Sequence, residues 1–111
     1  MAAQPALSNF ELMVMLAIIR IGDDAYGVSI SDEIEETTGN EVLLGSVYDA
    51  LTRLEEKGLI VSRLGDATAE RGGRAKRHFR ATSQGLRVVR ETQRALVQLW
   101  KGLPELKEGK A

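Results

Sequence analysis

The stretch that decides the fold is residues 45–60, which read Gly-Ser-Val-Tyr-Asp-Ala-Leu-Thr-Arg-Leu-Glu-Glu-Lys-Gly-Leu-Ile. Its apolar residues recur at helical spacing and form one stripe, made of Val47, Ala50, Leu51 and Leu54. The stripe predicts a helix that starts near Gly45 or Ser46 and runs to Lys57, where Gly58 stops it. Polar side chains lie on the opposite side, at Asp49, Thr52, Arg53 and Glu56, and Ser46 and Tyr48 flank them. The helix is therefore expected to bury one face and to expose the other.

A first helix is predicted over residues 9–21. Ser8 or Asn9 is the expected cap, and Glu11 lies in the first turn, where a negative charge favours the positive end of the helix dipole. The helix is apolar nearly all round, so it needs cover on more than one side. In so short a chain, we expect a second subunit to provide part of that cover.

A second helix is predicted over residues 26–38, after a turn at Gly22-Asp23-Asp24. Its inward residues are Ile34 and either Val28 or Ile30, and its acidic residues point outward. The pair Gly39-Asn40 ends it, because both residue types tolerate a positive φ.

The periodicity changes after the third helix. Residues 59–64 are apolar and β-branched and predict a strand, and residues 77–81 predict a returning strand with Phe79 as its inward anchor. The polar, glycine-containing loop of residues 65–76 joins them. Together they predict a hairpin with a long basic tip.

A last helix is predicted over residues 82–103, with Thr82 as its cap and Pro104 beyond its end. Spacings of three and four residues mark a heptad seam through Leu86, Val89, Gln93, Leu96, Trp100 and Leu103. The seam predicts a homodimer held by this helix and aided by the first helix through Phe10 and Met13. A core helix of a single chain can show the same spacing.

The predicted order of helix, helix, helix, hairpin and helix defines a mainly α (α+β) fold, a winged helix-turn-helix with a two-stranded wing. We expect a DNA-binding domain over residues 8–81, a dimerisation helix over residues 82–103, and flexible tails at residues 1–7 and 104–111. A third helix packed at a fixed angle on the second suits the major groove of DNA.

Composition excludes several kinds of function. A chain of 111 residues supports one domain, and the absence of cysteine excludes disulfides, thiolate catalysis and cysteine zinc sites. With one histidine and no Ser-His-acid set, we expect no enzyme, no metal and no cofactor. The longest apolar run, residues 12–19, is too short for a membrane span, and no basic segment marks an export signal. A cytoplasmic protein without membrane contact is expected.

Charge is unevenly distributed along a chain whose net charge is −1. Residues 23–41 hold seven acids and no base, whereas residues 63–94 hold nine bases and three acids. Such segregation creates a local positive surface, which attracts a phosphate backbone. A solvated basic face without a partner is the alternative on charge alone.

Several motifs resemble those of the PadR family of transcriptional regulators. Residues 45–60 resemble the family's third helix, and Tyr26-Gly27 resembles the start of its second helix. Gly72-Gly73-Arg74, residues 76–82 and Gly85 resemble its wing and the cap of its last helix. The resemblance covers about residues 8–103 and implies a dimeric DNA-binding regulator, usually a repressor. Some members release DNA when a small aromatic ligand or a stress signal acts on them. His78, Ala81 and Asp49 depart from the family pattern.

The candidate DNA contacts lie on two elements. They are Ser46, Tyr48, Asp49, Thr52 and Arg53 on the third helix, and Arg71, Gly72, Gly73, Arg74 and Lys76 on the wing. Asp49 can accept from a cytosine amino group or serve the helix dipole, and Tyr48 can contact DNA or pack against the second helix. His78 is expected on the strand surface.

The expected partners are double-stranded DNA with a palindromic operator, a second copy of the chain, and a small aromatic effector. Trp100 is expected to pack in the dimer interface or to stack on that effector. The rival function is a winged-helix protein–protein interaction module that does not bind DNA.

Overall fold

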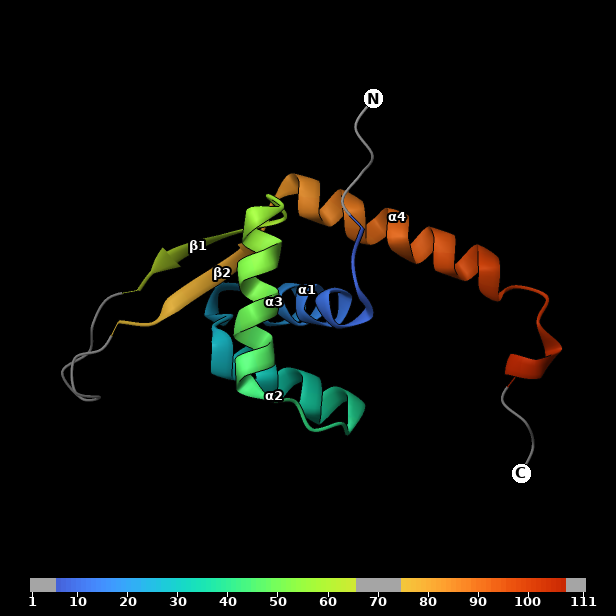
Figure 1. Cartoon of the computed structure of the whole chain (residues 1–111), viewed down its shortest axis with the longest axis horizontal. Helices are drawn as coiled ribbons and strands as arrows, with labels where there is room; N and C mark the ends of the chain where they lie inside the picture. The colour runs from blue at the N-terminus through green and yellow to red at the C-terminus, as the bar shows by residue number, and fades with distance from the viewer. Residues whose placement is uncertain (1–5, 66–74, 108–111) are drawn as a thin grey trace.

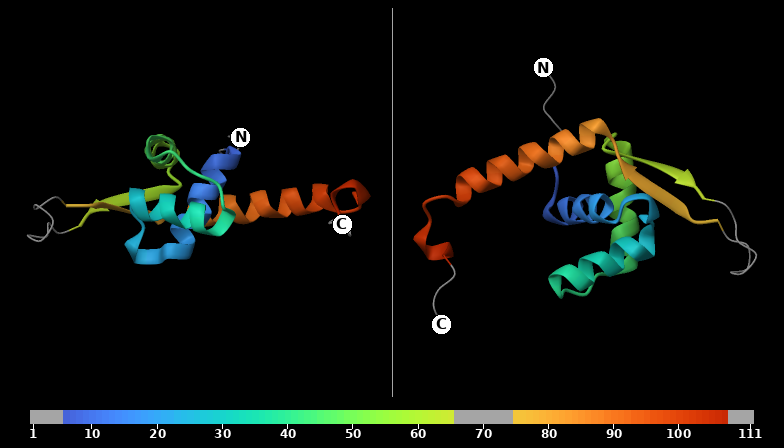
Figure 2. Two further views of the ribbon diagram at one scale, coloured as in Figure 1. Left: turned by 90° about the horizontal axis from the view of Figure 1, so that it is seen from below. Right: turned by 180° about the vertical axis from the view of Figure 1, so that it is seen from behind.

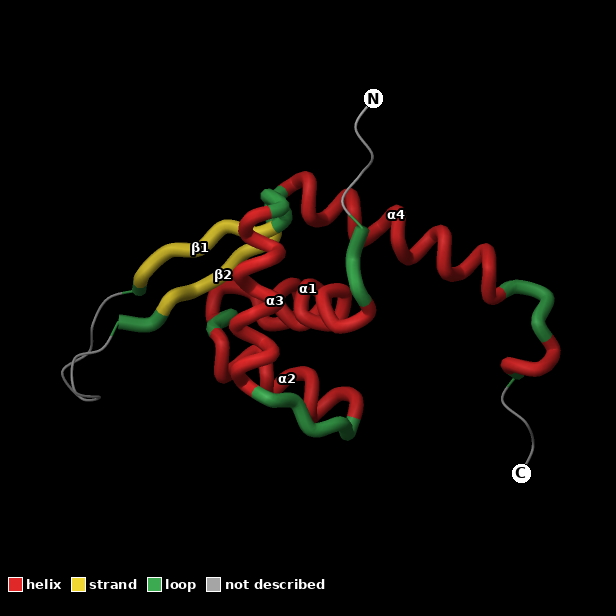
Figure 3. Tube along the Cα trace, in the orientation of Figure 1, coloured by secondary structure: helices red, strands yellow, loops and turns green. Residues whose placement is uncertain are grey.

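The structure is a computed structural model that describes residues 6–65 and 75–107 (Figure 1). The elements in chain order are α1 Asn9–Ile21, the 3-10 turn η1 Gly22–Asp24, α2 Gly27–Thr38, α3 Leu44–Glu56, β1 Ile60–Leu64, β2 Arg77–Ala81, α4 Ser83–Trp100 and the 3-10 turn η3 Pro104–Leu106. The predicted order of helices and strands is confirmed, and with it the winged helix-turn-helix fold. A short loop joins α2 to α3 (Figure 3).

The helix starts follow from local hydrogen bonds. Ser8, rather than Asn9, caps α1, because its side chain accepts from the backbone N–H of Glu11, while the Glu11 carboxylate accepts from the N–H of Ser8. The third helix begins at Leu44, slightly before the predicted start, because the carbonyl of Leu43 accepts from the backbone N–H groups of Ser46 and Val47. It ends at Glu56, one residue before the predicted end, and the predicted stop Gly58 follows with a φ of +76°.

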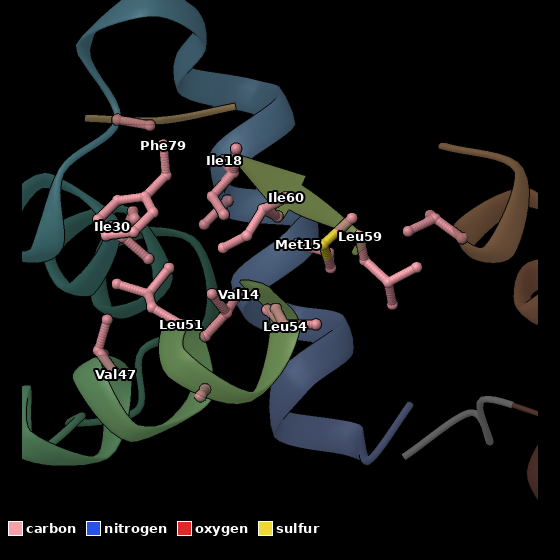
Figure 4. Packing of buried hydrophobic residues seen from close by; sticks show 14 of the residues in the cluster. Val14, Met15, Ile18, Ile30, Val47, Leu51, Leu54, Leu59, Ile60 and Phe79 are labelled. Carbon is pink, nitrogen blue, oxygen red and sulfur yellow. The ribbon is translucent and has the colours of Figure 1, made fainter. Parts of the chain in front are cut away.

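The core lies where α1, α2, α3 and the base of the hairpin meet (Figure 4). The predicted stripe of α3 is fully buried in it, and Phe79 of β2 is 6% exposed. On α2 the inward residue is Ile30, which is fully buried, and Val28 is 43% exposed. The core therefore fixes α3 by its inner face, and the outer face stays in solvent.

The wing is formed by β1 and β2, which pair antiparallel with Ile60 opposite Ala81 and Leu64 opposite Arg77. A third segment joins them, because Tyr26 forms an isolated bridge with His78, and the N–H of Phe79 donates to the carbonyl of Ala25 at 2.8 Å. The sequence predicts a helix start at Tyr26, but the structure begins α2 at Gly27. A bridge of one residue pair has no periodicity, so the sequence pattern does not reveal it.

The last helix projects away from this body (Figures 1 and 2). Its residues Gly85, Val88 and Val89 are buried, whereas every residue from Gln93 to Lys107 is exposed. The radius of gyration is 16.3 Å, against about 13 Å for a compact domain of this length. The predicted helix end at residue 103 is wrong, because Lys101 is extended and Gly102 has a φ of +76°, so α4 stops at Trp100.

Two apolar residues of α1 also stay partly exposed. Leu16 is 43% exposed and Ile19 is 41% exposed, although α1 packs against α2, α3, β2 and α4. One chain therefore leaves part of α1 uncovered. Within the described ranges 6–65 and 75–107, no helix is long and apolar enough to cross a membrane.

Candidate nucleic-acid interface

The outer face of α3 carries all the helix residues that the sequence singles out. Ser46, Tyr48, Asp49, Thr52 and Arg53 are exposed. By helical spacing, the outermost row is Gly45, Asp49, Thr52 and Glu56. Tyr48 borders this row on the side of the wing, and Arg53 borders it on the side of α1. The face is polar and unobstructed by the described part of the chain.

Tyr48 links α3 to the start of α2. A Cβ atom placed on Gly27 would lie 2.5 Å from the Tyr48 ring, so the ring packs directly on the glycine backbone. Packing of Tyr48 against the second helix is thus confirmed, and the side chain is still 47% exposed. Glycine at position 27 allows this close packing, because a side chain there would displace the ring.

An ion-pair cluster fixes the other side of α3. The carboxylate of Glu11 on α1 accepts from Nε of Arg53 at 2.8 Å and from Nζ of Lys57 at 2.9 Å. Its side chain is only 3% exposed, against 48% for Arg53 and 30% for Lys57. Lys57 also donates to the carbonyl of Ala6 at 2.9 Å. The sequence predicts only a dipole role for Glu11, because spacing within α3 says nothing about a partner 42 residues earlier.

The cluster sets the ionisation of Glu11. Burial by itself raises the pKa of this carboxyl, but the hydrogen bonds from Lys57, the Ser8 backbone and Arg53 outweigh burial and lower the pKa to about 2. Glu11 is therefore ionised at neutral pH. The two cations and one carboxylate leave the cluster with a net positive charge.

Stability should depend on the ionisation of Glu11 in acid. Because its pKa falls from 4.5 to about 2 on folding, its contribution is complete above pH 4.5 and is lost as the pH falls towards 2. We expect Glu11→Gln to lower the free energy of unfolding by about 2–3 kcal/mol at neutral pH. The difference between the two proteins should shrink steadily below pH 4.5. Urea denaturation across this pH range measures it.

Glu33→Gln is the matched control for this measurement. Glu33 pairs with Arg20 on the surface, where the Arg20 side chain is 61% exposed. Exposed pairs contribute little, so this variant should change the free energy of unfolding much less. Equal losses in the two variants, with the same pH dependence, would contradict a special role for Glu11.

The wing strands present basic residues next to α3. Arg77 donates through Nη1 to Ser62 at 3.0 Å, and the Ser62 hydroxyl donates to Glu55 of α3 at 2.8 Å. Lys76 places its Nζ 4.2 Å from the centre of the Tyr26 ring. The candidate residues Arg71, Gly72, Gly73 and Arg74 lie outside the described residues. The strands thus bring cations to one flank of the exposed α3 face.

His78 lies deeper than expected. Its side chain is 16% exposed, because Tyr26 contacts its ring edge-on at a centroid distance of 5.8 Å and Gly65 approaches it closely. The expectation of a strand-surface position is therefore wrong. Its Nε2 is 3.9 Å from a carboxylate oxygen of Asp24, and its Nδ1 has no hydrogen-bond partner among the described residues.

The seam residues of α4 differ in their surroundings. Val89 is 8% exposed and belongs to the core of its own chain, whereas Leu86, Leu96, Trp100 and Leu103 are 37–61% exposed. Phe10 and Met13 of α1 are half-buried against the core. A groove of about 540 Å³ between α1 and α4 is lined by Leu12, Leu16, Val89, Gln93, Leu96, Val97, Trp100 and Lys101. Part of the predicted seam thus lines an open apolar groove.

A helical core, a third helix with a free outer face and a basic hairpin beside it define a winged helix-turn-helix protein. The family described as "Transcriptional regulator PadR-like family" matches residues 15–91. The chain belongs to this family of transcriptional regulators, whose members are not enzymes. No group of metal-ligating side chains that could hold an ion occurs in the part of the chain that the structure describes.

Individual relatives agree with this assignment. Transcriptional regulator Rv3488 of Mycobacterium tuberculosis is 37% identical over 79 residues, which cover 69% of this chain and 67% of that protein. A PadR family regulator from Eggerthella lenta is 26% identical with a TM-score of 0.70, over 88% of this chain and 83% of that one. A regulator from Clostridium thermocellum has the same fold, with a TM-score of 0.71 and 23% identity over 88% and 92% of the two chains.

Proposed function

We propose that the protein is a homodimeric repressor that binds a two-fold symmetric operator in duplex DNA. The observation that carries the proposal is the exposed polar face of α3, which is anchored by a buried stripe and flanked by basic wing strands. A helix held in this way fits the major groove, where side chains meet base edges. The proposal places the protein in the cytoplasm with the DNA.

The charges on α3 indicate that α3 and the wing have different roles in DNA binding. Helix α3 contains three acids, Asp49, Glu55 and Glu56, and a single base, Arg53. Attraction to phosphates must therefore come mainly from bases outside α3, which include Arg63, Lys76, Arg77 and Arg80 on or beside the wing strands. In this proposal the wing supplies affinity, and α3 supplies discrimination between sequences.

The homodimer is supported by apolar surface that one chain leaves exposed. Leu99 and Trp100, the last two residues of α4, are 74% and 61% exposed, and Leu103 just beyond the helix is 42% exposed. Together with the groove between α1 and α4, they form an exposed apolar surface of the kind that marks protein interaction sites. A second copy with the same exposed surface is the proposed cover, and it sets the spacing of two α3 helices on the DNA.

A small aromatic effector is the remaining part of the proposal. Trp100 lines the apolar groove with Gln93 as a polar neighbour, and a flat ligand could stack on its ring. Trp100 is the only tryptophan, so its emission reports directly on the groove. If planar aromatic cations leave both the emission and the DNA affinity unchanged, Trp100 has a packing role.

Selection of bound sequences from a random duplex library tests the proposed function. A consensus with two-fold symmetry is the expected result, since each subunit would read one half-site. The rival, a protein–protein interaction module, predicts no enrichment and only weak, sequence-independent binding. A steep fall of affinity with salt accompanies DNA binding through phosphate contacts and separates the two functions further.

Removing bases from the wing tip should weaken binding to all duplexes alike. For Arg71→Ala combined with Arg74→Ala, the slope of log affinity against log salt should flatten by about one unit for each phosphate that the protein no longer neutralises. Salt titrations on the selected operator and on random duplex measure the slope. Arg20→Ala combined with Lys107→Ala removes the same charge from α1 and from the segment after α4, and it should leave the slope nearly unchanged. An unchanged slope in the wing variant would remove both arginines from the interface.

A further inference from the structure

The single base of α3 is held by a carboxylate from another helix. Nε of Arg53 donates to Oε2 of Glu11 at 2.8 Å, and the carboxylate is almost completely buried while the arginine side chain is about half exposed. We propose that Glu11 is a positioning residue that orients Arg53 for contact with a base edge of the operator. The inference rests on the proposed function and adds to it a residue that does not touch DNA.

The geometry suits this role because of the shape of the guanidinium group. With Nε bound to Glu11, the two terminal amino groups remain for another acceptor, and the planar group is fixed in direction by the hydrogen bond behind it. Arginine recognises guanine with two parallel donors aimed at O6 and N7. An arginine whose side chain is already fixed in the free protein loses less conformational entropy on binding DNA than a mobile arginine does.

Glu11 is itself firmly held. Its Oε1 accepts from the backbone N–H of Ser8 at 2.9 Å and from Nζ of Lys57 at 2.9 Å, and its own N–H donates to the Ser8 hydroxyl. The carboxylate therefore keeps its place when Arg53 meets a new acceptor. Because Lys57 shares the same carboxylate, the positive charge of Arg53 is not cancelled.

The ion pair between Arg53 and Glu11 keeps Arg53 from pairing with Asp49, the neighbouring acid on α3. Asp49 lies four residues before Arg53 on the same helix, and both line a shallow surface hollow with Phe10 and Ser46. At this spacing an arginine can pair with the aspartate. Arg53 pairs with Glu11 instead, and Asp49 forms no ion pair with any residue that the structure describes. Glu11 thus keeps two side chains of the α3 face available at once.

A double-mutant cycle between Glu11 and Arg53 tests the inference on the selected operator and on random duplex. Glu11→Gln keeps a residue type that serves in a capping box but removes the charge. In the native background we expect it to lower operator affinity about tenfold, and to leave affinity for random duplex unchanged or higher because a negative charge is removed. In the Arg53→Ala background, Glu11→Gln should change operator affinity less than about twofold.

Two further variants separate positioning from stability. Lys57→Met removes the other cation from Glu11, but the hydrogen bonds from Ser8 and Arg53 remain. It should lower stability, and it should change the ratio of operator to random affinity less than Glu11→Gln does. Glu11→Asp keeps the charge but is shorter by one methylene, so it withdraws the carboxylate from Arg53 and should lower the ratio in a fold-competent protein. All affinities are measured at a temperature at which circular dichroism shows each variant folded.

The outcomes distinguish the two proposals. One contrary result is that Glu11→Gln lowers operator affinity equally in the native and the Arg53→Ala backgrounds, and another is that it lowers affinity equally for operator and random duplex. Either result overturns the positioning role of Glu11 and leaves the proposed function standing. A gain in operator affinity in Glu11→Gln overturns it as well. A native protein that prefers no duplex sequence overturns the proposed function and the inference together.

Discussion

Replacing Gly85 with alanine is expected to lower the free energy of unfolding by about 3–5 kcal/mol, a large part of the total for a domain of this size. Gly85 lies in the first turn of α4, where its N–H donates to the Thr82 side chain. A Cβ atom on it would overlap the backbone carbonyl of Leu59 and lie 3.0 Å from the end of the Met15 side chain. Neither the backbone nor the core can move aside cheaply.

Gly85→Ala should also break a backbone hydrogen bond at the start of α4. The carbonyl of Leu59 also accepts the N–H of Thr82 at 3.0 Å, so pushing α4 away breaks the hydrogen bond that holds the N-cap residue of the helix. Urea denaturation of Gly85→Ala should show a much lower midpoint with an unchanged slope.

Gly45→Ala is the matched control. Gly45 lies within α3, and nothing occupies the space within 4 Å of a Cβ placed on it. Alanine there should raise the free energy of unfolding by about 0.4–1 kcal/mol, because it restricts the unfolded chain and meets no atom in the folded one. Equal stability of the Gly85 and Gly45 variants would show that α4 does not start against the backbone of Leu59 as described.

Leu96→Glu is expected to dissociate the proposed dimer and to lower operator affinity by about 100-fold or more. Leu96 is 41% exposed in the single chain and lines the groove between α1 and α4. If a second copy covers this groove, a carboxylate there would be buried without a partner, which is costly. Loss of the dimer lowers operator affinity, because each separated subunit then binds its half-site without help from the other.

Gln98→Glu makes the same charge change on the opposite side of α4, two residues away, where helical spacing directs the side chain away from Leu96. It should leave both association and operator affinity nearly unchanged. Sedimentation at micromolar concentration reports the association state. A native protein that sediments as a monomer, or a dimeric Leu96→Glu, would contradict the dimer through α4.

Periodic features of this fold are predictable from sequence. The stripe of α3, the inward position of Phe79 and the order of the elements depend on local spacing, and all are confirmed. The end of α4 is predicted too late, because Pro104 marks where a helix cannot continue, whereas the extended Lys101 ends it sooner.

Contacts between distant segments are the part that sequence does not reveal. The spacing within α3 predicts that Arg53 lies beside the exposed face, but its partner Glu11 comes from α1. Likewise, the bridge between Tyr26 and His78 joins residues on separate elements through the backbone. Such contacts depend on how helices and strands are placed in space, which local patterns do not encode.

The outermost row of α3 makes few contacts with the rest of the chain. Within residues 6–65 and 75–107, the only hydrogen bond from a side chain in this row is from Thr52 to the carbonyl of Tyr48, one turn earlier. Gly45, Asp49, Thr52 and Glu56 can therefore be exchanged without disturbing the core, whereas Tyr48 and Arg53 also hold helices together. Operator preference should be able to diverge among relatives, or in a randomised library at these four positions, without compensating changes elsewhere in the fold.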